Sequence, residues 1–174
     1  MASTSYSNPF VVRPGPRFLL RHPAHLLALG LGSGLSPVAP GTVGSLFGWW
    51  LFYAVLGRID ALNAPVAMLG LLGIAFVVGV FACQITGRNL GAPDHGAMVW
   101  DEIVAMVLVL ALIPRTFWWQ FAGFVLFRFF DVLKPAPIRG FERRHKNGFG
   151  VMADDILAAF YALLVLALFK AVML

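Results

Sequence analysis

Charged side chains are scarce in this sequence of 174 residues, since Asp, Glu, Lys and Arg together make up only 12% of it. A soluble domain usually has about 25% of charged residues. Hydrophobic residues make up 60% of the chain, and its mean hydropathy is +0.83. Because so few charges cannot cover a surface that faces water, the composition predicts a membrane protein. Anionic lipid headgroups then explain the net charge of +5 better than nucleic acid does.

Several motifs that would indicate other functions are missing from the sequence. Cys83 is the only cysteine, which excludes a disulfide within the chain and indicates a small packing residue. The chain has no His-Glu-x-x-His zinc motif, no Gly-Lys-Ser/Thr of a P-loop and no Asp-Gly-x-x-Ala-Arg pattern of nucleotide–alcohol phosphotransferases. It shows no internal repeat, and residues 1–25 do not read as a signal peptide, because they carry arginines and prolines and no clean apolar core.

Five apolar segments predict an all-α protein, namely a polytopic helical membrane bundle with some short or partly immersed helices. The segments are residues 43–57, 64–83, 103–113, 116–130 and 156–174. Residues 64–83 reach the roughly 20 residues that cross a bilayer, whereas 103–113 are short for a full span. Spanning strands would alternate apolar and polar side chains, and these segments do not. We expect residues 1–20 to form a flexible basic N-terminal arm and residues 21–174 a single helical domain.

The charged residues are divided unevenly between the two ends of the predicted helices. If the N-terminus is cytoplasmic, ten Lys and Arg residues fall on the cytoplasmic side, and three (Arg58, Arg115 and Lys170) fall on the other side. The positive-inside rule supports this orientation. Seven of the eight acidic residues share the cytoplasmic side: Asp94, Asp101, Glu102, Asp131, Glu142, Asp154 and Asp155. Because phospholipid headgroups do not favour a concentration of carboxylates, we predict a shared site there.

Three acidic groups at helix ends are placed to converge in this site: Asp101–Glu102, Asp131 and Asp154–Asp155. Carboxylate oxygens suit Mg²⁺ or Mn²⁺, and Mg²⁺ commonly combines one or two carboxylates with phosphate oxygens. Arg128, Lys134 and Arg139 are interleaved with these acids. Acids that hold a metal ion and bases that hold anionic oxygens together indicate a phosphate-handling site.

A loop rich in glycine, GSGLSPVAPGTVGS at residues 32–45, precedes a predicted helix and offers backbone N–H groups to an anion. Simpler interpretations remain for each feature. The loop can be a plain turn. Asp154–Asp155 can cap a helix, and Asp101–Glu102 can be an ordinary helix-start pair. Residues 128–144 can be an interfacial basic segment. The four histidines (His22, His25, His95 and His145) can be structural or exposed.

Four motifs resemble those of the phosphatidylglycerophosphatase A family. They are GSGLSPVAPGTVGSL at 32–46, DHGAMVWDEIVAM at 94–106, RFFDVLKPAPIR at 128–139 and GFGVMADDILAAF at 148–160. The resemblance extends from about His25 to Phe160. It implies a multi-pass enzyme of the bacterial cytoplasmic (inner) membrane. This enzyme would remove the terminal phosphate of phosphatidylglycerophosphate with Mg²⁺, giving phosphatidylglycerol, and would have its active site at the cytoplasmic helix ends.

The resemblance also implies roles for individual residues. The catalytic residues, which would hold one or two Mg²⁺ ions, are Asp101, Glu102, Asp131, Asp154 and Asp155. The substrate-binding residues would be Lys134, Arg139, Arg128, Thr42, Ser45 and His95. Pro135 and Pro137 would restrict the backbone between the basic side chains.

Several alternatives stay open at this point. Water or a carboxylate could attack phosphorus, and His95 or one of the acids could be the base. The substrate could be another lipid phosphate, and the protein could be an oligomer. Two other classes also remain, namely a transporter and a non-catalytic membrane subunit. A transporter is disfavoured because the acids lie at segment ends and the sequence has no repeat symmetry.

Overall fold

The computed structural model describes residues 11–136 and 138–173, which fold into helices joined by turns and short loops. The prediction of an all-α protein is therefore confirmed for this part of the chain. Pro137 and the side chain of Glu142 lie outside the described part. The helices in chain order are α1 (Pro16–Leu19), α2 (Pro23–Ala28), η1 (Gly30–Leu35), α3 (Pro40–Ala54), η2 (Leu56–Arg58), η3 (Asp60–Asn63), α4 (Pro65–Leu90), α5 (Trp100–Leu112), α6 (Phe117–Leu133), α7 (Ile138–Arg144) and α8 (Gly148–Met173).

Each predicted apolar segment corresponds to one of the helices α3, α4, α5, α6 and α8, with changes at the ends. The largest change is in α8, which begins at Gly148 rather than at residue 156. Glycine weakens a helix interior, so the sequence around Gly148 and Gly150 favours a loop. Two contacts stabilise the helix instead: Asn147 Oδ1 accepts from Gly150 N at 2.9 Å, and Gln84 Oε1 accepts from Gly148 N at 2.9 Å.

Helix α5 is the centre of the molecule and packs on α3, α4, α6 and α8. Seven of its hydrophobic side chains are buried: Ile103, Val104, Ala105, Met106, Val107, Val109 and Leu110. Helix α3 approaches it closely through Gly48, where an added Cβ would lie 3.0 Å from the Ile103 carbonyl oxygen. With 13 residues, α5 is only about 20 Å long, which is too short to cross the hydrocarbon layer by itself.

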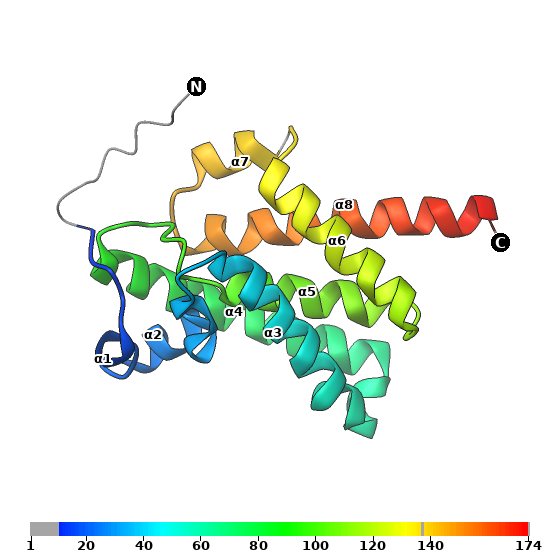
Figure 1. Ribbon diagram of the computed structural model, residues 1–174, viewed down its shortest axis with the longest axis horizontal. Helices are drawn as coiled ribbons and strands as arrows, with labels where there is room; N and C mark the ends of the chain where they lie inside the picture. The colour runs from blue at the N-terminus through cyan, green and yellow to red at the C-terminus, as the bar shows by residue number, and fades with distance from the viewer. Residues whose placement is uncertain (1–10, 137, 174) are drawn as a thin grey trace.

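Helices α4 and α8 are long and apolar enough to cross a membrane, and both have 26 residues. They pack on each other and run in opposite directions along the long axis of the molecule (Figure 1). Large apolar side chains are exposed on both helices, among them Ile74 and Phe81 on α4 and Phe160 and Leu168 on α8. Together with the composition, these helices identify a membrane protein, because side chains of this kind are stable against lipid.

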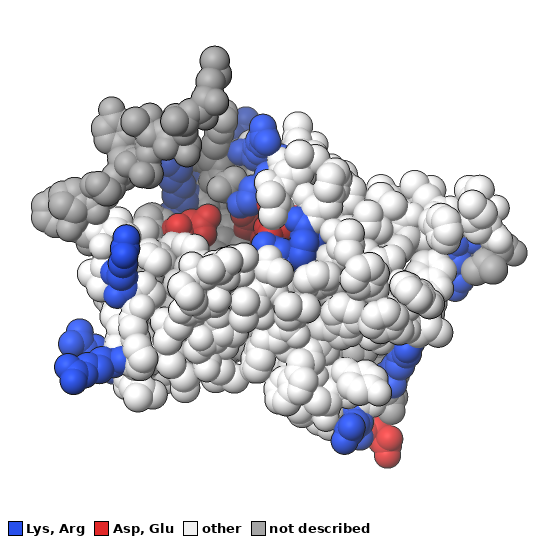
Figure 2. Space-filling model, in the orientation of Figure 1, with Lys and Arg blue, Asp and Glu red and all other residues white. Residues whose placement is uncertain are grey.

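The helix ends that carry the acids lie toward one end of the molecule (Figure 1). They are the starts of α5 and α8 and the end of α6. In Figure 2, charged side chains gather toward the left and right of the visible face, and a broad uncharged area separates them. We call these regions the acidic end, with Asp101, Glu102, Asp131 and Asp154–Asp155, and the loop end, with Arg58, Asp60 and Arg115.

The first twenty residues were predicted to be a flexible arm, and the structure describes part of them. Residues Pro16–Leu19 form α1, and Val12 N donates to the Leu90 carbonyl oxygen at 3.0 Å, at the end of α4. His25 in α2 is buried, with Phe18 stacked on its ring at 4.1 Å between ring centroids. Its Nδ1 lies 3.1 Å from the Phe18 carbonyl oxygen, so His25 has a structural role in holding α1.

Candidate active site

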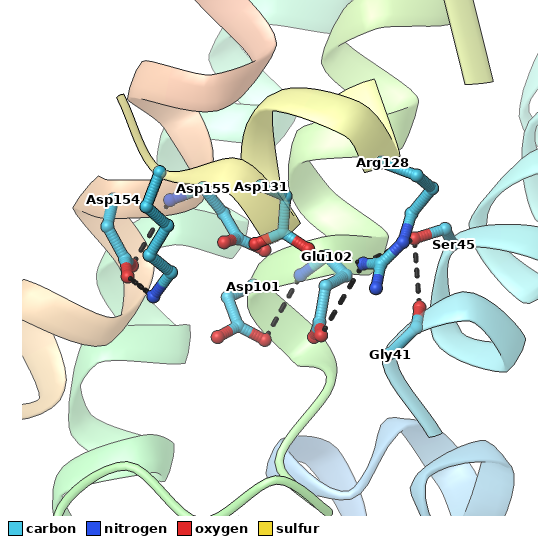
Figure 3. A network of polar contacts seen from close by, with 9 residues as sticks. Gly41, Ser45, Asp101, Glu102, Arg128, Asp131, Asp154 and Asp155 are labelled. Carbon is cyan, nitrogen blue, oxygen red and sulfur yellow. Dashed lines mark hydrogen bonds and ion pairs between the residues drawn. The ribbon is translucent and has the colours of Figure 1, made fainter. Parts of the chain in front are cut away.

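Three carboxylates from two helices converge at the acidic end. Ligand oxygens of Asp101 and Glu102, in the first turn of α5, and of Asp155, in α8, all lie within 4.8 Å of one another. The side chains of Asp101 and Asp155 are buried, and that of Glu102 is half-buried. We call these three residues the carboxylate triad. Figure 3 shows the triad, with the Asp131 carboxylate beside that of Asp155.

The position of Asp155 within α8 decides between two interpretations of the sequence. Because α8 begins at Gly148, Asp154 and Asp155 lie in its second turn, away from the free N–H groups of the first turn. The interpretation that they cap a helix is therefore wrong. Asp101, in contrast, lies in the first turn of α5, and its Oδ1 accepts from Glu102 N at 3.0 Å. Its place at a helix start and its place in the triad are compatible.

The triad has the properties of a site for a divalent cation. Glu102 Oε2 and Asp155 Oδ2 are buried and have no hydrogen-bond partner among the described residues. Burial raises the pKa of Asp101 well above its usual value and that of Glu102 to about 8. Burying several carboxylates together is unfavourable unless a cation compensates their charge. Oxygen-only donors at this spacing fit Mg²⁺ or Mn²⁺, so the residues present are suited to the predicted metal.

Arg128, near the end of α6, connects the triad to its surroundings. Its Nη1 lies 2.7 Å from Asp131 Oδ2 and 3.8 Å from Glu102 Oε1, and it donates to Ser45 Oγ at 3.4 Å. Ser45 is fully buried and donates to the Gly41 carbonyl oxygen at 2.9 Å. The predicted residues Arg128 and Ser45 are therefore in the site, and Asp131 is held by Arg128 rather than within the triad.

Lys134 lies at the end of α6 in the left-handed backbone region, with φ of 42°. Its Nζ contacts Asp154 Oδ2 at 2.7 Å, and Asp154 is buried. A lysine in this backbone region is strained by about 1 kcal/mol or more, and residues in such conformations are common at functional sites. At this helix end the Lys134 ammonium group pairs with Asp154, the neighbour of the triad residue Asp155, where the sequence predicts a cation.

The other predicted site residues differ in their placement. Arg139 is exposed, and its Nη2 donates to the Leu133 carbonyl oxygen at 2.9 Å; in the described chain it does not contact the acids. Thr42 is half-buried in the first turn of α3. His95 Nδ1 accepts from Ala97 N at 3.1 Å, and burial lowers the His95 pKa. Because Nδ1 accepts this bond, the neutral ring carries its proton on Nε2, and that atom is then a hydrogen-bond donor.

Two features of the site were not found from the sequence. Gly41 touches the triad so closely that an added Cβ would overlap Glu102 Oε1 and lie 3.1 Å from Arg128 Nη2. The glycine-rich loop was its signal, but the contact with Glu102 was not predicted. A pocket of about 430 Å³ also opens beside Asp154. It is lined by Asp94, His145 and Lys146, of which His145 was interpreted as structural or exposed.

Comparison with known proteins agrees with the resemblance that the sequence motifs indicate. Residues 26–170 match the family described as Phosphatidylglycerophosphatase A. A Haemophilus influenzae protein named Phosphatidylglycerophosphatase A is 47% identical over 162 residues, which cover 87% of this chain and 91% of that protein. An Escherichia coli protein of the same name is 44% identical over 143 residues, covering 82% of this chain and 80% of that protein.

A third relative carries a different name. A Bacteroides thetaiotaomicron protein with the provisional name phosphatidylinositol-3-phosphatase is 36% identical over 148 residues, covering 82% of this chain and 90% of that protein. No solved structure matches the chain.

Proposed function

Because the chain belongs to the phosphatidylglycerophosphatase A family of phosphatases, we propose that it hydrolyses the terminal phosphate of phosphatidylglycerophosphate with Mg²⁺, giving phosphatidylglycerol. The observation that carries the Mg²⁺ dependence is the carboxylate triad, with its two buried carboxylate oxygens that lack partners. Membership of a family of phosphatases also argues against the transporter and the non-catalytic subunit that the sequence left open.

The triad residues Asp101, Glu102 and Asp155 would hold the metal ion. When bound, Mg²⁺ would offset negative charge on the transferred phosphoryl group. Lys134 and Arg128 lie on either side of the triad and would neutralise the remaining phosphate oxygens, since each already contacts a carboxylate of the site. The N–H group at His95 Nε2 would donate a hydrogen bond to an oxygen of the substrate headgroup.

In the hydrolysis, the oxygen of water bonds to phosphorus and the bond from phosphorus to the terminal glycerol oxygen breaks. That glycerol oxygen takes up a proton, so the products are phosphatidylglycerol and inorganic phosphate. Asp131 lies beside Asp155 and contacts Arg128 (Figure 3), and its carboxylate would accept the proton of the attacking water.

The orientation in the membrane follows from the basic residues. Nine basic residues with described side chains belong to the side that was predicted to be cytoplasmic: Arg13, Arg17, Arg21, Arg88, Arg128, Lys134, Arg139, Arg144 and Lys146. By the positive-inside rule the acidic end would face the cytoplasm, in a multi-pass arrangement. A lipid with its acyl tails in the bilayer would then present its headgroup at the level of the triad.

Phosphate release by the purified protein in detergent tests the proposal. We expect Mg²⁺-dependent release that is fastest with phosphatidylglycerophosphate and slower with phosphatidic acid. The Bacteroides relative favours one further lipid as a substrate, phosphatidylinositol 3-phosphate, which belongs in the same assay. Faster release from that lipid would mean that the protein is a lipid phosphatase with a different substrate. No release from any of the three lipids by folded protein would contradict the proposal.

A further inference from the structure

A pocket beside Asp154 contains two basic residues, His145 and Lys146, that have no role in the predicted machinery. Its volume of about 430 Å³ is within the range of about 300–1,000 Å³ that is typical of small-ligand pockets. The lining comprises Pro93, Asp94, His145, Lys146, Gly150, Val151 and Asp154. Asp154 in this lining is adjacent in α8 to the triad residue Asp155, so the pocket lies near the triad.

We propose that this pocket is a second phosphate-binding site of the enzyme, in which Lys146 binds an anionic phosphate group and His145 accepts a hydrogen bond from a hydroxyl group of the same ligand, while the triad acts on another phosphate. The inference rests on the proposed function. The bound group has two sources: the headgroup phosphodiester that is not cleaved, or the inorganic phosphate that is released. Lys146 is exposed, so its ammonium group can reach a phosphate oxygen at little cost in desolvation.

The His145 ring is held in one orientation by three contacts. It stacks on Phe141 with ring centroids 4.3 Å apart, it meets Phe149 edge-on at 6.3 Å, and its Nδ1 lies 3.1 Å from the Phe141 carbonyl oxygen. A carbonyl oxygen can only accept, so Nδ1 carries a proton, and among the described residues Nε2 is the nitrogen left to accept a hydrogen bond from a ligand. A fixed ring whose second nitrogen is available in a pocket is typical of a binding residue.

The backbone around His145 is built for close contact. An added Cβ at Gly150, in the first turn of α8, would overlap the His145 carbonyl oxygen, so this approach requires glycine. The approach brings His145 and Lys146, which follow α7, over the start of α8 and toward Asp154. The GFGVMADD stretch therefore shapes the pocket as well as supplying Asp154 and Asp155.

Asp94 in the same lining favours the headgroup as the source of the phosphate. A carboxylate repels a bare phosphate ion but accepts a hydrogen bond from a hydroxyl group. The headgroup of phosphatidylglycerophosphate has a glycerol hydroxyl between its two phosphates. A pocket that combines Asp94 with Lys146 and His145 thus suits a hydroxylated phosphate headgroup, and it would set a preference for lipids with two phosphates over phosphatidic acid, which has one.

The test uses the full-length protein in detergent and the variants Lys146→Gln, His145→Asn and Lys170→Gln. His145→Asn keeps a donor near the Nδ1 position and removes Nε2. Lys170→Gln is the matched control, since Lys170 is an exposed lysine of α8 outside the pocket. For each variant, kcat/KM is measured with phosphatidylglycerophosphate and with phosphatidic acid, and inorganic phosphate is titrated as an inhibitor and, by calorimetry, as a ligand.

If the pocket holds the headgroup, Lys146→Gln lowers kcat/KM for phosphatidylglycerophosphate about tenfold more than for phosphatidic acid, as loss of one charge-assisted hydrogen bond predicts. If it holds the released phosphate, both lipids are affected equally and inorganic phosphate binds about tenfold more weakly. The proposal is overturned if Lys146→Gln and His145→Asn match Lys170→Gln in lipid preference and in phosphate affinity. If the wild type hydrolyses neither lipid, the proposed function fails, but calorimetry with inorganic phosphate still tests whether the pocket binds phosphate. The failure of the proposed function is therefore distinguished from the failure of the pocket proposal.

Discussion

The two ends of this bundle both carry charged residues, but the charges are in different environments. At the loop end, Arg58, Asp60 and Arg115 are exposed on the connections between helices. At the acidic end, Asp101, Asp154 and Asp155 are buried on helices, with Glu102 half-buried beside them. Exposed charges are solvated by water and headgroups, whereas buried ones need partners. The comparison indicates that burial and convergence, rather than charge itself, mark the end where the chemistry occurs.

The largest expected difference between the two ends concerns single acids. We expect Asp155→Asn to lower kcat by about a thousandfold or more, because the site loses a carboxylate that stabilises charge in the transition state. The matched change Asp60→Asn at the loop end should leave kcat within about twofold, as is usual for an exposed residue. Phosphate release by the two purified variants measures this difference, and similar losses in both would remove the distinction between the ends.

Removal of the metal should act at the acidic end alone. We expect a chelator to abolish phosphate release and Mg²⁺ to raise the thermal unfolding temperature of the wild type. A ligand at 100 times its Kd stabilises the folded state by about 2.7 kcal/mol. In Glu102→Gln this stabilisation by Mg²⁺ should be much smaller, since one triad ligand is lost. An equal rise in unfolding temperature in both proteins would mean that Mg²⁺ binds elsewhere.

Arg128 on α6 and Arg115 on the turn before α6 offer a further comparison. We expect Arg128→Gln to lower kcat/KM by about tenfold to a hundredfold, because Asp131 and Glu102 lose the guanidinium between them. Arg128→Lys should recover only part of this loss, since an ammonium group cannot contact three partners in one plane. Arg115→Gln at the loop end should have little effect on kcat/KM, and a loss comparable to that of Arg128→Gln would contradict the account.

The smallest expected effect comes from adding one methyl group. An added Cβ at Gly41 would overlap the Glu102 carboxylate, so Gly41→Ala should displace it and lower kcat/KM by about tenfold. An added Cβ at Gly70 in α4 meets nothing within 4 Å, so Gly70→Ala serves as the control and should leave activity unchanged. Equal activity of the two variants would show that the position of Glu102 is not critical.

Much of this architecture could be predicted from the sequence, for identifiable reasons. Long apolar segments fixed the number and order of the main helices, and chain reversal placed most of the acids at one end. The pair Arg128–Asp131 is spaced i, i+3 on one helix, so its contact was foreseeable. The start of α8 was missed because glycines normally weaken helices, and the cap by Asn147 outweighed this tendency.

The parts that could not be predicted depend on contacts between distant segments. The pair Lys134–Asp154 requires the end of α6 to lie beside the second turn of α8, and no sequence spacing encodes that. The same limit applies to Gly41 against Glu102 and to the pocket with His145 and Lys146. Arg139 has the residue type and position of a phosphate ligand, but its side chain bonds the end of α6 instead.

The central claim is that the carboxylate triad holds a divalent cation, and metal binding tests it most directly. Electron paramagnetic resonance of Mn²⁺, which shares the oxygen-ligand preference of Mg²⁺, reports binding without any turnover. The account predicts that the purified wild type binds Mn²⁺ in competition with Mg²⁺ and that Asp155→Asn, folded and in the same detergent, binds it far more weakly. Equal Mn²⁺ binding by the two proteins would contradict the account.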